Sequence, residues 1–492
     1  MSFLPYVFIP ITLLACWRLL STRYNRLRHI PGPWLASCSN LWKLATISRG
    51  DMHTECVANH DRYGPIVRIG PHHVSVASPE SFYTVHASTK AFAKSDIYEV
   101  GAPTYRGKRL ENLFSIRDVN HHATLRKNLG SLYTKGAVRS LEPLVDSCVD
   151  LFIHRLRDLC KHGPATVDMS LWLHLYAYDS LAEVNVSQKL GFLQKGDDVG
   201  GMIGAANRIF YMVGLLTQAP FLHALFKILR TAVPAEKVEP LIEYTFNIVE
   251  QRLSSPTADD DMLNKMLKLH EAQPQKVTIH ELTSAIFINL MAGHDVLAVT
   301  LRAMWYFLAQ NPPVLQKLRN ELQAAAAERS TSVQGLTAQD LSSLPYLGAV
   351  ILETFRMHPT TGTILERRVP AEGATLEGHF LPGGTTVGVN AWVLHRNRQI
   401  FGQDTDIYRP ERWLEASAER KTEMNRNLFT FGAGPRTCIG QNIAMIQIYK
   451  VVAGFFDKFD VKLANPNRPW KVTGSWVTKQ IDMDMIVTPR GL

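Results

Sequence analysis

The sequence predicts one mainly α domain with small β-sheets. Helical periodicity of apolar residues dominates positions 119–266. A second long helix is predicted to start at the capping box T-x-x-E of residues 278–281 and to end at the Asn-Pro-Pro of residues 311–313. Alternating polar and apolar residues bounded by turn signals predict short strands at positions 68–80 and 379–395.

The composition is that of a folded globular protein with a basic balance of charge. The chain has 492 residues, of which 46% are hydrophobic and 20% charged, so wholesale disorder is not expected. Its formal charge is +9, from 53 basic and 44 acidic residues. Such a charge suits an anionic membrane surface, an acidic protein partner or nucleic acid. We do not expect nucleic-acid binding, because no run of basic residues is interleaved with aromatic residues.

The N-terminus is predicted to be a membrane anchor. Residues 3–17 contain no charge, and four arginines follow between residues 18 and 28. A bilayer span needs roughly 17–25 residues, and the segment reaches that length if it continues to Leu20 while Arg18 snorkels. A cleaved signal peptide is the alternative, but no small-residue cleavage site follows. Residues 1–28 are therefore predicted to be a single-pass anchor with a basic flank, which leaves the body of the chain in the cytoplasm.

Two further stretches of the chain are strongly apolar. The predicted helix of residues 278–311 is a poor membrane span, because His294, Asp295 and Arg302 interrupt it. We expect it to run through the middle of a soluble body, since it is apolar on every side. Residues 200–230 are either core or a patch that rests on the membrane, and the predicted anchor favours the second interpretation.

Cys438 stands in a sequence context that the other five cysteines lack. Those five are scattered without a C-x-x-C pattern and are predicted to be reduced thiols. Gly432 and Gly434 predict a loop, and a helical pattern starts at Cys438. The N–H groups and dipole of a helix N-terminus stabilise a thiolate. Such a thiolate fits an axial ligand of haem iron with Arg436 near a propionate, and a buried cysteine in a glycine-rich turn is the alternative.

The complete pattern around the cysteine is Phe431-x-x-Gly434-x-Arg436-x-Cys438-x-Gly440. It resembles the haem-binding loop of the cytochrome P-450 family of haem-thiolate monooxygenases, and the resemblance extends over nearly the whole chain. It implies the cytochrome P-450 fold, in which haem b lies between a long central helix and the cysteine-bearing loop.

The same resemblance bears on domain organisation. It implies a single haem-thiolate catalytic domain over residues 29–492, in place of the about three domains that length alone suggests. The stiff sequence IPGPW, residues 30–34, resembles the hinge that follows the anchor in microsomal members of the family. Residues 392–414 resemble the corresponding segment of fungal members.

Residues far from the loop also match the family. Glu353-x-x-Arg356 resembles its E-x-x-R motif, whose side chains share a helix face, and Arg412 is implied to close a buried structural triad with them. His122-x-x-x-Arg126 stands where the family has W-x-x-x-R, which implies contact with a propionate. The residues implied to bind or surround the haem are Cys438 (the iron ligand), Arg436, Arg126, His122, Arg367, Phe431, Gly432, Gly440, Ala292 and Gly293.

The oxygen side of the site is implied to lie on the long predicted helix. Residues 291–300, MAGHDVLAVT, resemble the family motif A-G-x-[D/E]-T-[T/S]. Ala292 and Gly293 match small residues that leave room for dioxygen, and Asp295 matches the acid that helps to deliver protons. His294 is a catalytic candidate beside the pocket, and a core histidine bonded inside the protein is the alternative.

Val296 departs from the family pattern, because it stands at the threonine position. Valine keeps the branched shape but has no hydroxyl, and Thr300, one turn away, would need an intervening water to replace it. Three interpretations follow. Protons still arrive through Asp295, His294, waters or a substrate hydroxyl, and the enzyme is a monooxygenase; the chemistry is atypical, such as rearrangement, dehydration, or ring or C–C/C–O bond formation; or the site is degenerate. The anchor and basic body favour the first.

The resemblance implies oxidation of a hydrophobic small molecule, in secondary metabolism, with O2 and electrons from NADPH. A flavin-containing NADPH-cytochrome reductase in the endoplasmic reticulum membrane would supply the electrons, and a cytochrome b-type protein is a further candidate donor. Candidate reductase contacts are Lys127, Lys135 and Arg426. The expected substrate contacts are residues 96–119, Ile288, Ala292, Val296, Thr363, Ile364, Trp476 and Val477.

Overall fold

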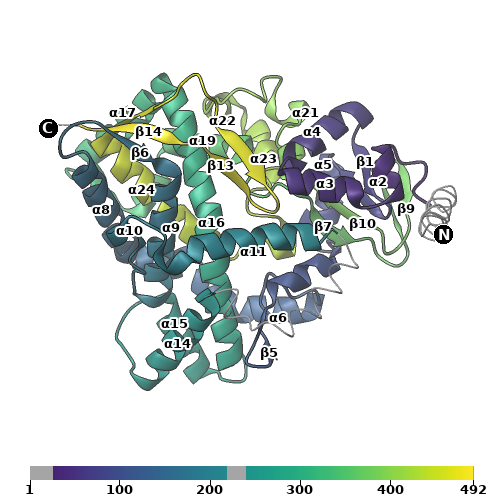
Figure 1. Cartoon of the computed structure of the whole chain (residues 1–492), viewed down its shortest axis with the longest axis horizontal. Helices are drawn as coiled ribbons and strands as arrows, with labels where there is room; N and C mark the ends of the chain where they lie inside the picture. Colours follow the sequence, from purple (N-terminus) through teal and green to yellow (C-terminus); the bar gives the residue numbers. More distant parts are fainter. Residues whose placement is uncertain (1–25, 219–239, 491–492) are drawn as a thin grey trace, which may run out of the picture.

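The computed structural model describes residues 26–218 and 240–490 and confirms the mainly α class with small β-sheets. The long helices gather on one side of the molecule, and the largest sheet with the short N-terminal helices lies on the other (Figure 1). The longer helices are α3 (Leu41–Arg49), α4 (Met52–Tyr63), α6 (Val119–Gly130), α8 (Glu142–Leu159), α9 (Met169–Val186), α11 (Met202–Leu216), α14 (Pro240–Ser254), α15 (Met262–Ala272), α16 (Ile279–Gln310), α17 (Pro312–Glu328), α19 (Pro345–Met357), α23 (Ala418–Arg426) and α24 (Gln441–Lys458).

Helix α16 runs through the middle of the body, as the sequence predicts (Figure 1). Its capping box is formed: the Thr278 hydroxyl accepts from the Glu281 N–H at 3.2 Å, and the Glu281 carboxylate accepts from the Thr278 N–H at 2.8 Å. The helix is long and apolar enough to cross a membrane, but 72% of its most apolar part is buried inside the protein. It is a core helix.

The largest sheet has five strands. Its order is β1-β2-β10-β7-β3, with β10 parallel to β2 and the other pairs antiparallel. The strands predicted within positions 68–80 and 379–395 are present as β1, β2, β9 and β10, whereas residues 391–394 form a short helix instead. The strands are β1 (Ile66–Gly70), β2 (His73–Val76), β3 (Ala93–Lys94), β4 (Thr104–Tyr105), β5 (Lys108–Arg109), β6 (Ala165–Asp168), β7 (Leu365–Arg368), β8 (Ala374–Leu376), β9 (His379–Leu381), β10 (Thr386–Val389), β11 (Phe459–Leu463), β12 (Lys471–Gly474), β13 (Thr478–Ile481) and β14 (Asp484–Pro489).

Two of the sequence predictions fall partly outside the described residues. Most of the predicted anchor precedes residue 26, and the apolar stretch of residues 200–230 is described only to residue 218. Within that part, residues 199–216 are also long and apolar enough to cross a membrane, and 22% of this stretch is buried. Tyr211 and Met212 on α11 are exposed. In the described part of the chain, the cysteines form no disulfide.

Candidate active site

The segment before α24 forms a tight loop around Cys438. The Cys438 N–H donates a hydrogen bond to the Phe431 carbonyl oxygen at 2.8 Å, which closes the loop. Gly432 and Gly434 have φ angles of 72° and 60°, in the left-handed region that favours glycine. At Gly434 a Cβ would lie 2.4 Å from the His86 carbonyl oxygen, so the absent side chain lets the two backbones approach.

The sulfur of Cys438 faces the start of α24. Burial raises the pKa of the thiol above its ordinary value, although the N–H groups of Gly440 and Gln441 and the charge of Arg126 act in the opposite direction. Surrounding protein therefore desolvates the sulfur, yet the Cys438 residue has an accessible surface. This combination is expected of a ligand atom that faces a binding site, where a metal cation favours the thiolate.

Four cationic side chains gather on one side of the cysteine loop without acidic partners. In the described part of the chain, no ion pair joins any of them to a carboxylate; they bond instead to neutral oxygens. Arg126 on α6 donates to the Thr437 carbonyl at 2.6 Å, and Arg436 donates to the Ile116 carbonyl at 2.7 Å. The other two members are Arg367 on β7, which donates to the Tyr98 hydroxyl at 3.1 Å, and Lys94 on β3, which donates to the Phe114 carbonyl at 2.6 Å.

The electrostatics of this cation cluster (Lys94, Arg126, Arg367 and Arg436) favour a bound anion. Burial and the charge of Arg367 lower the pKa of Arg436 to about 10. Burial and the charges of Arg367 and Arg436 lower the pKa of Lys94 well below its usual range. His122 is buried beside them, and burial together with the charge of Arg436 lowers its pKa to about 3. Among the residues that the structure describes, none forms a hydrogen bond with the buried Nε of Arg367. The donor set therefore fits the two carboxylates of haem beside a cysteine ligand.

Sequence reasoning assigned His122, Arg126, Arg367 and Arg436 to this region but missed Lys94. The local sequence around Lys94 resembles no motif. Its place is fixed by strand pairing, which sets Lys94 opposite Arg367.

The predicted structural triad is brought together in a buried network. Arg356 on α19 donates twice to the Glu353 carboxylate, at 2.9 and 2.8 Å. Arg412 on α22 (Arg412–Glu415) donates its Nε–H to Glu353 Oε1 at 3.0 Å, and Trp413 donates to Oε2 at 2.9 Å. The three charged side chains are at most 2% exposed. Because each charge meets an opposite one in a bidentate or shared geometry, the network is compatible with burial.

One face of α16 is accessible inside the molecule. Ile288, Ala292 and Val296 lie four residues apart on one side of the helix. Ala292 is exposed and the other two are half-buried, whereas Phe287, Met291 and Leu297 are buried. Gly293 points elsewhere: a Cβ at this position would lie 2.7 Å from Leu181 on α9. The small size of Gly293 therefore allows α16 to pack against α9, and Ala292 is the small residue on the accessible face.

Asp295 of α16 is buried and strongly paired. His174 on α9 lies 3.2 Å from Oδ1, and the Lys479 ammonium on β13 lies 2.8 Å from Oδ1 and 2.6 Å from Oδ2. Burial alone would raise the pKa of Asp295, but the hydrogen bond from His174 and the charge of Lys479 outweigh it, so the pKa lies well below its usual range. The carboxylate is ionised at neutral pH.

His294 lies in the core beside this carboxylate. Its ring stacks on Tyr178 at 3.9 Å between centroids, its Nδ1 is 3.2 Å from His174 Nε2, and its buried Nε2 has no partner in the described part of the chain. Burial lowers the pKa of His294 to about 3, so the ring is neutral at neutral pH. These contacts fit the interpretation of His294 as a core histidine. Any effect of His294 on catalysis would be indirect, through the neighbouring Asp295.

An aromatic cluster adjoins the accessible face of α16. The rings of Tyr98, Phe114 and Trp476 meet edge to face, with centroids 5.3 to 6.3 Å apart. Several of the expected substrate contacts meet here. The cluster comprises Tyr98, Val299, Trp476 and Val477, with Ile97, Phe114, Phe210 and Val296 packed against it.

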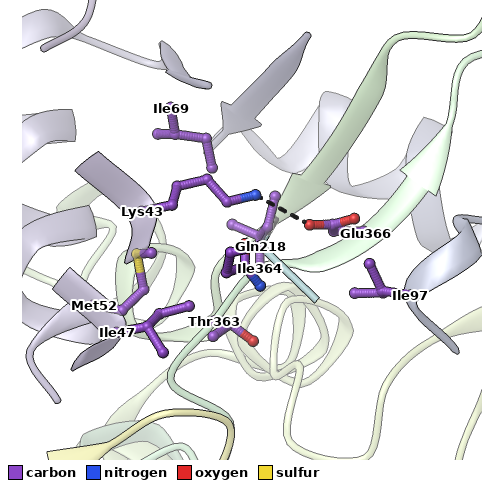
Figure 2. Close-up of a pocket in the computed structure, with 9 residues that line it drawn as sticks. All are labelled: Lys43, Ile47, Met52, Ile69, Ile97, Gln218, Thr363, Ile364 and Glu366. Atoms are coloured by element: carbon purple, nitrogen blue, oxygen red, sulfur yellow. Dashed lines mark hydrogen bonds and ion pairs between the residues drawn. The ribbon is translucent and has the colours of Figure 1, made fainter. Parts of the chain in front are cut away.

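Thr363 and Ile364, the other expected substrate contacts, line a separate small cavity (Figure 2). Its volume is about 10 Å³, which is about enough for one water molecule. Lys43 and Glu366 meet across it at 3.4 Å. The cavity is too small for a substrate, and neither Thr363 nor Ile364 belongs to the aromatic cluster.

Comparison with known proteins agrees with this geometry. The model of the family Cytochrome P-450 matches residues 30–486. A cytochrome P-450 monooxygenase from Aspergillus terreus is 36% identical over 471 residues, covering 92% of this chain and 94% of the relative. The cytochrome P-450 monooxygenase cicH of Emericella nidulans is 34% identical, covering 92% and 91%. A pisatin demethylase of Fusarium vanettenii is 33% identical, covering 98% and 95%.

The family match spans nearly the whole chain. Haem b is the cofactor of the family, and its members take electrons from a redox partner to oxidise small molecules. The chain therefore belongs to the cytochrome P-450 family and is an oxidoreductase of the monooxygenase type.

Proposed function

We propose that the protein oxidises a hydrophobic small molecule of fungal secondary metabolism, using O2 and electrons that an NADPH-cytochrome reductase delivers. The observation that carries this proposal is the accessible Cys438 beside four cations, of which Lys94 and Arg367 are buried, with no acidic partner in the described part of the chain. The aromatic cluster of Tyr98, Phe114 and Trp476 supports an apolar substrate. The similarity to fungal monooxygenases, including a pisatin demethylase, supports small-molecule oxidation.

Each group of residues has its own part in this reaction. Cys438 would ligate the iron, and the cation cluster of Lys94, Arg126, Arg367 and Arg436 would hold the propionates. Haem, when bound, supplies oxygen activation and transfer to the substrate. Ala292 and Val296 shape the oxygen side, and the buried Asp295 carboxylate holds the Lys479 ammonium and the neutral His174 ring nearby.

We also propose that the protein works at the endoplasmic reticulum membrane with its body in the cytoplasm. The uncharged N-terminal segment and its arginine flank support this location. Trp34 and Leu41 are exposed by 71% and 58%, close to the end of the predicted anchor. The exposed cations Lys127, Lys135 and Arg426 are available to the reductase or a cytochrome b-type donor.

An atypical reaction, such as rearrangement or dehydration, is the second candidate. Val296 favours it, because no hydroxyl stands at this position on the accessible face of α16. The Thr300 hydroxyl does not compensate directly, since it donates to the Val296 carbonyl at 2.8 Å. Product formation without reductase and NADPH would favour this candidate.

The proposed function is tested with the membrane-bound enzyme, reconstituted with NADPH-cytochrome reductase. The reduced carbonyl complex should show the red-shifted Soret band of a thiolate-ligated haem, and Cys438→Ser should abolish it. Incubation with an extract of fungal metabolites should consume one or more apolar compounds only when NADPH is present. A colourless protein, or an unchanged spectrum in Cys438→Ser, would contradict the proposal.

A further inference from the structure

Lys479 is joined to three elements that border the aromatic cluster. It lies on β13, it pairs with Asp295 on α16 at 2.6 Å, and its ammonium donates to the side chain of Asn207 on α11. The same ammonium lies 5.8 Å from the centre of the Phe210 ring. Its side chain is only 21% exposed, so the pairing is largely removed from water.

Other residues of the β12–β13 hairpin also bond to α11 and α16. The Ser475 hydroxyl donates to the Phe210 carbonyl of α11 at 3.1 Å, and the Gln480 side chain donates to the Val299 carbonyl of α16 at 3.0 Å. A Cβ on Gly214 of α11 would lie 2.6 Å from Ser475, so the contact is close. The hairpin therefore bridges α11 and α16, and Lys479 supplies its only link in the described chain to the Asp295 carboxylate.

The groups around Asp295 leave Lys479 as its main cationic partner. Arg302 on α16 lies on the far side of His174 and donates to His174 Nδ1 at 3.1 Å, so Nε2 carries the proton that faces Asp295. Burial lowers the pKa of His174 to about 4, so this ring is neutral at neutral pH. His294 is neutral as well. The residue types His174, His294 and Asp295 also suit a metal ion, but the ammonium of Lys479 lies against the carboxylate.

We propose that Lys479 is a positioning residue, which holds the Asp295 carboxylate turned toward α9 and couples it to α11. A displacement of α11 at the aromatic cluster then acts on Asp295 through one side chain. This inference rests on the proposed function, in which Asp295 takes part in proton supply. It concerns how the acid is held and does not depend on the identity of the substrate.

Hydrogen exchange of the haem-loaded enzyme tests the coupling without turnover. In Lys479→Met, amide exchange should rise in three segments at once: β13, α11 and the middle of α16 around Asp295. Asn207→Ala removes the hydrogen bond between Lys479 and α11 but keeps the pairing of Lys479 with Asp295. Amide exchange should therefore rise in α11 and stay unchanged around Asp295. Lys471→Met removes an exposed charge from the same hairpin and is the matched control. Unchanged exchange around Asp295 in Lys479→Met would overturn the proposal.

A double-mutant cycle on peroxide release tests whether Lys479 acts through Asp295. The enzyme is reconstituted with NADPH-cytochrome reductase and given NADPH alone as the probe, without added substrate. Lys479→Met should change the rate of peroxide release by about threefold or more when residue 295 is Asp, and by a much smaller factor in Asp295→Asn. Lys479→Arg should restore the wild-type rate, because it keeps the charge. Equal effects in both backgrounds would show that Lys479 only braces the hairpin.

A pH profile separates positioning from bracing. In Lys479→Met, the ammonium no longer helps the His174 hydrogen bond to offset burial, so the pKa of Asp295 should rise and the rate of peroxide release should depend on pH at higher pH values than in wild type. His174, His294 and Arg302 remain around the carboxylate in this variant. If Lys479→Met fails to fold, two other variants replace it. Lys479→Met/Asp295→Asn leaves no unpaired buried charge, and Lys479→Gln keeps a hydrogen-bond donor beside Asp295. If Asp295→Asn alone leaves peroxide release unchanged, proton supply by Asp295 fails, while the exchange experiment still decides the coupling.

Discussion

The Thr300 hydroxyl donates a hydrogen bond of 2.8 Å to the carbonyl oxygen of Val296, one turn earlier on α16. The bond engages the only proton of the hydroxyl with the backbone. Val296 itself presents methyl groups on the accessible face of the helix, in line with Ile288 and Ala292. The side chain nearest the oxygen side is therefore apolar, and the first hydroxyl along the helix is already bonded.

Val296→Thr should change the fraction of NADPH that ends as hydrogen peroxide. The variant introduces a hydroxyl on the accessible face. A positioned proton donor typically raises the rate of a reaction by about 10²- to 10⁴-fold. We expect a change of at least about twofold in peroxide released per NADPH consumed, measured in the reconstituted system. Thr300→Val is the matched control and should leave this ratio unchanged. An equal ratio in Val296→Thr and wild type would exclude position 296 from proton delivery.

Glu353→Gln should destabilise the folded protein strongly. It leaves the buried guanidinium groups of Arg356 and Arg412 without their shared carboxylate, and breaking a buried ion pair in this way costs about 3–5 kcal/mol. The free energy of unfolding and the yield of haem-loaded protein should both fall. Glu328→Gln, which removes an exposed partner of Arg329, should change the free energy of unfolding by less than about 1 kcal/mol. Similar losses in the two variants would argue against the triad as a structural device.

Lys94→Met should act in opposite directions on haem binding and on the haem-free protein. Loss of a charged donor should speed haem transfer to an apomyoglobin acceptor on the order of tenfold. The haem-free protein should melt at a higher temperature, because Lys94 no longer repels Arg367 and Arg436. The exposed Lys90 provides the control, Lys90→Met, which should affect neither quantity. Faster haem loss together with a lower melting temperature would indicate a general packing defect instead.

The folded protein should lose stability as the pH falls below about 6.5, the ordinary pKa of histidine. Burial lowers the pKa of His358 to about 3 and that of His53 to about 4. The unfolded chain therefore takes up protons that the folded chain refuses, and each such group costs up to about 1.4 kcal/mol per pH unit between the two pKa values. In His358→Gln, the free energy of unfolding should fall less steeply between pH 6.5 and 4.5 than in wild type. An identical slope would mean that His358 gains its proton without unfolding.

The parts of the site that the sequence predicts correctly are those held by local spacing. The loop around Cys438 and the pair of Glu353 and Arg356 are set by neighbours in sequence, so glycine spacing and helical periodicity are sufficient to find them. The capping box of α16 is local in the same way.

Other parts depend on contacts between distant segments. Lys479 meets Asp295 across 184 positions of sequence, and Lys94 meets Arg367 only through strand pairing. No local pattern marks either lysine. Gly293 shows the same limit: its motif implies room for oxygen, but its direction on α16 is set by Leu181 on α9. Spacing identifies which residues share a helix, and packing decides which way each one faces.

The crowding of positive charge around Arg367 has a consequence for biogenesis. A newly made chain gathers Lys94, Arg126, Arg367 and Arg436 before any negative group arrives to balance them. On the proposed function, we therefore expect maturation to end with an electrostatic step, in which the prosthetic group balances these charges. Cells that synthesise this polypeptide faster than they supply haem should accumulate a poorly consolidated precursor for quality control to remove, so haem supply sets the ceiling on how much enzyme survives.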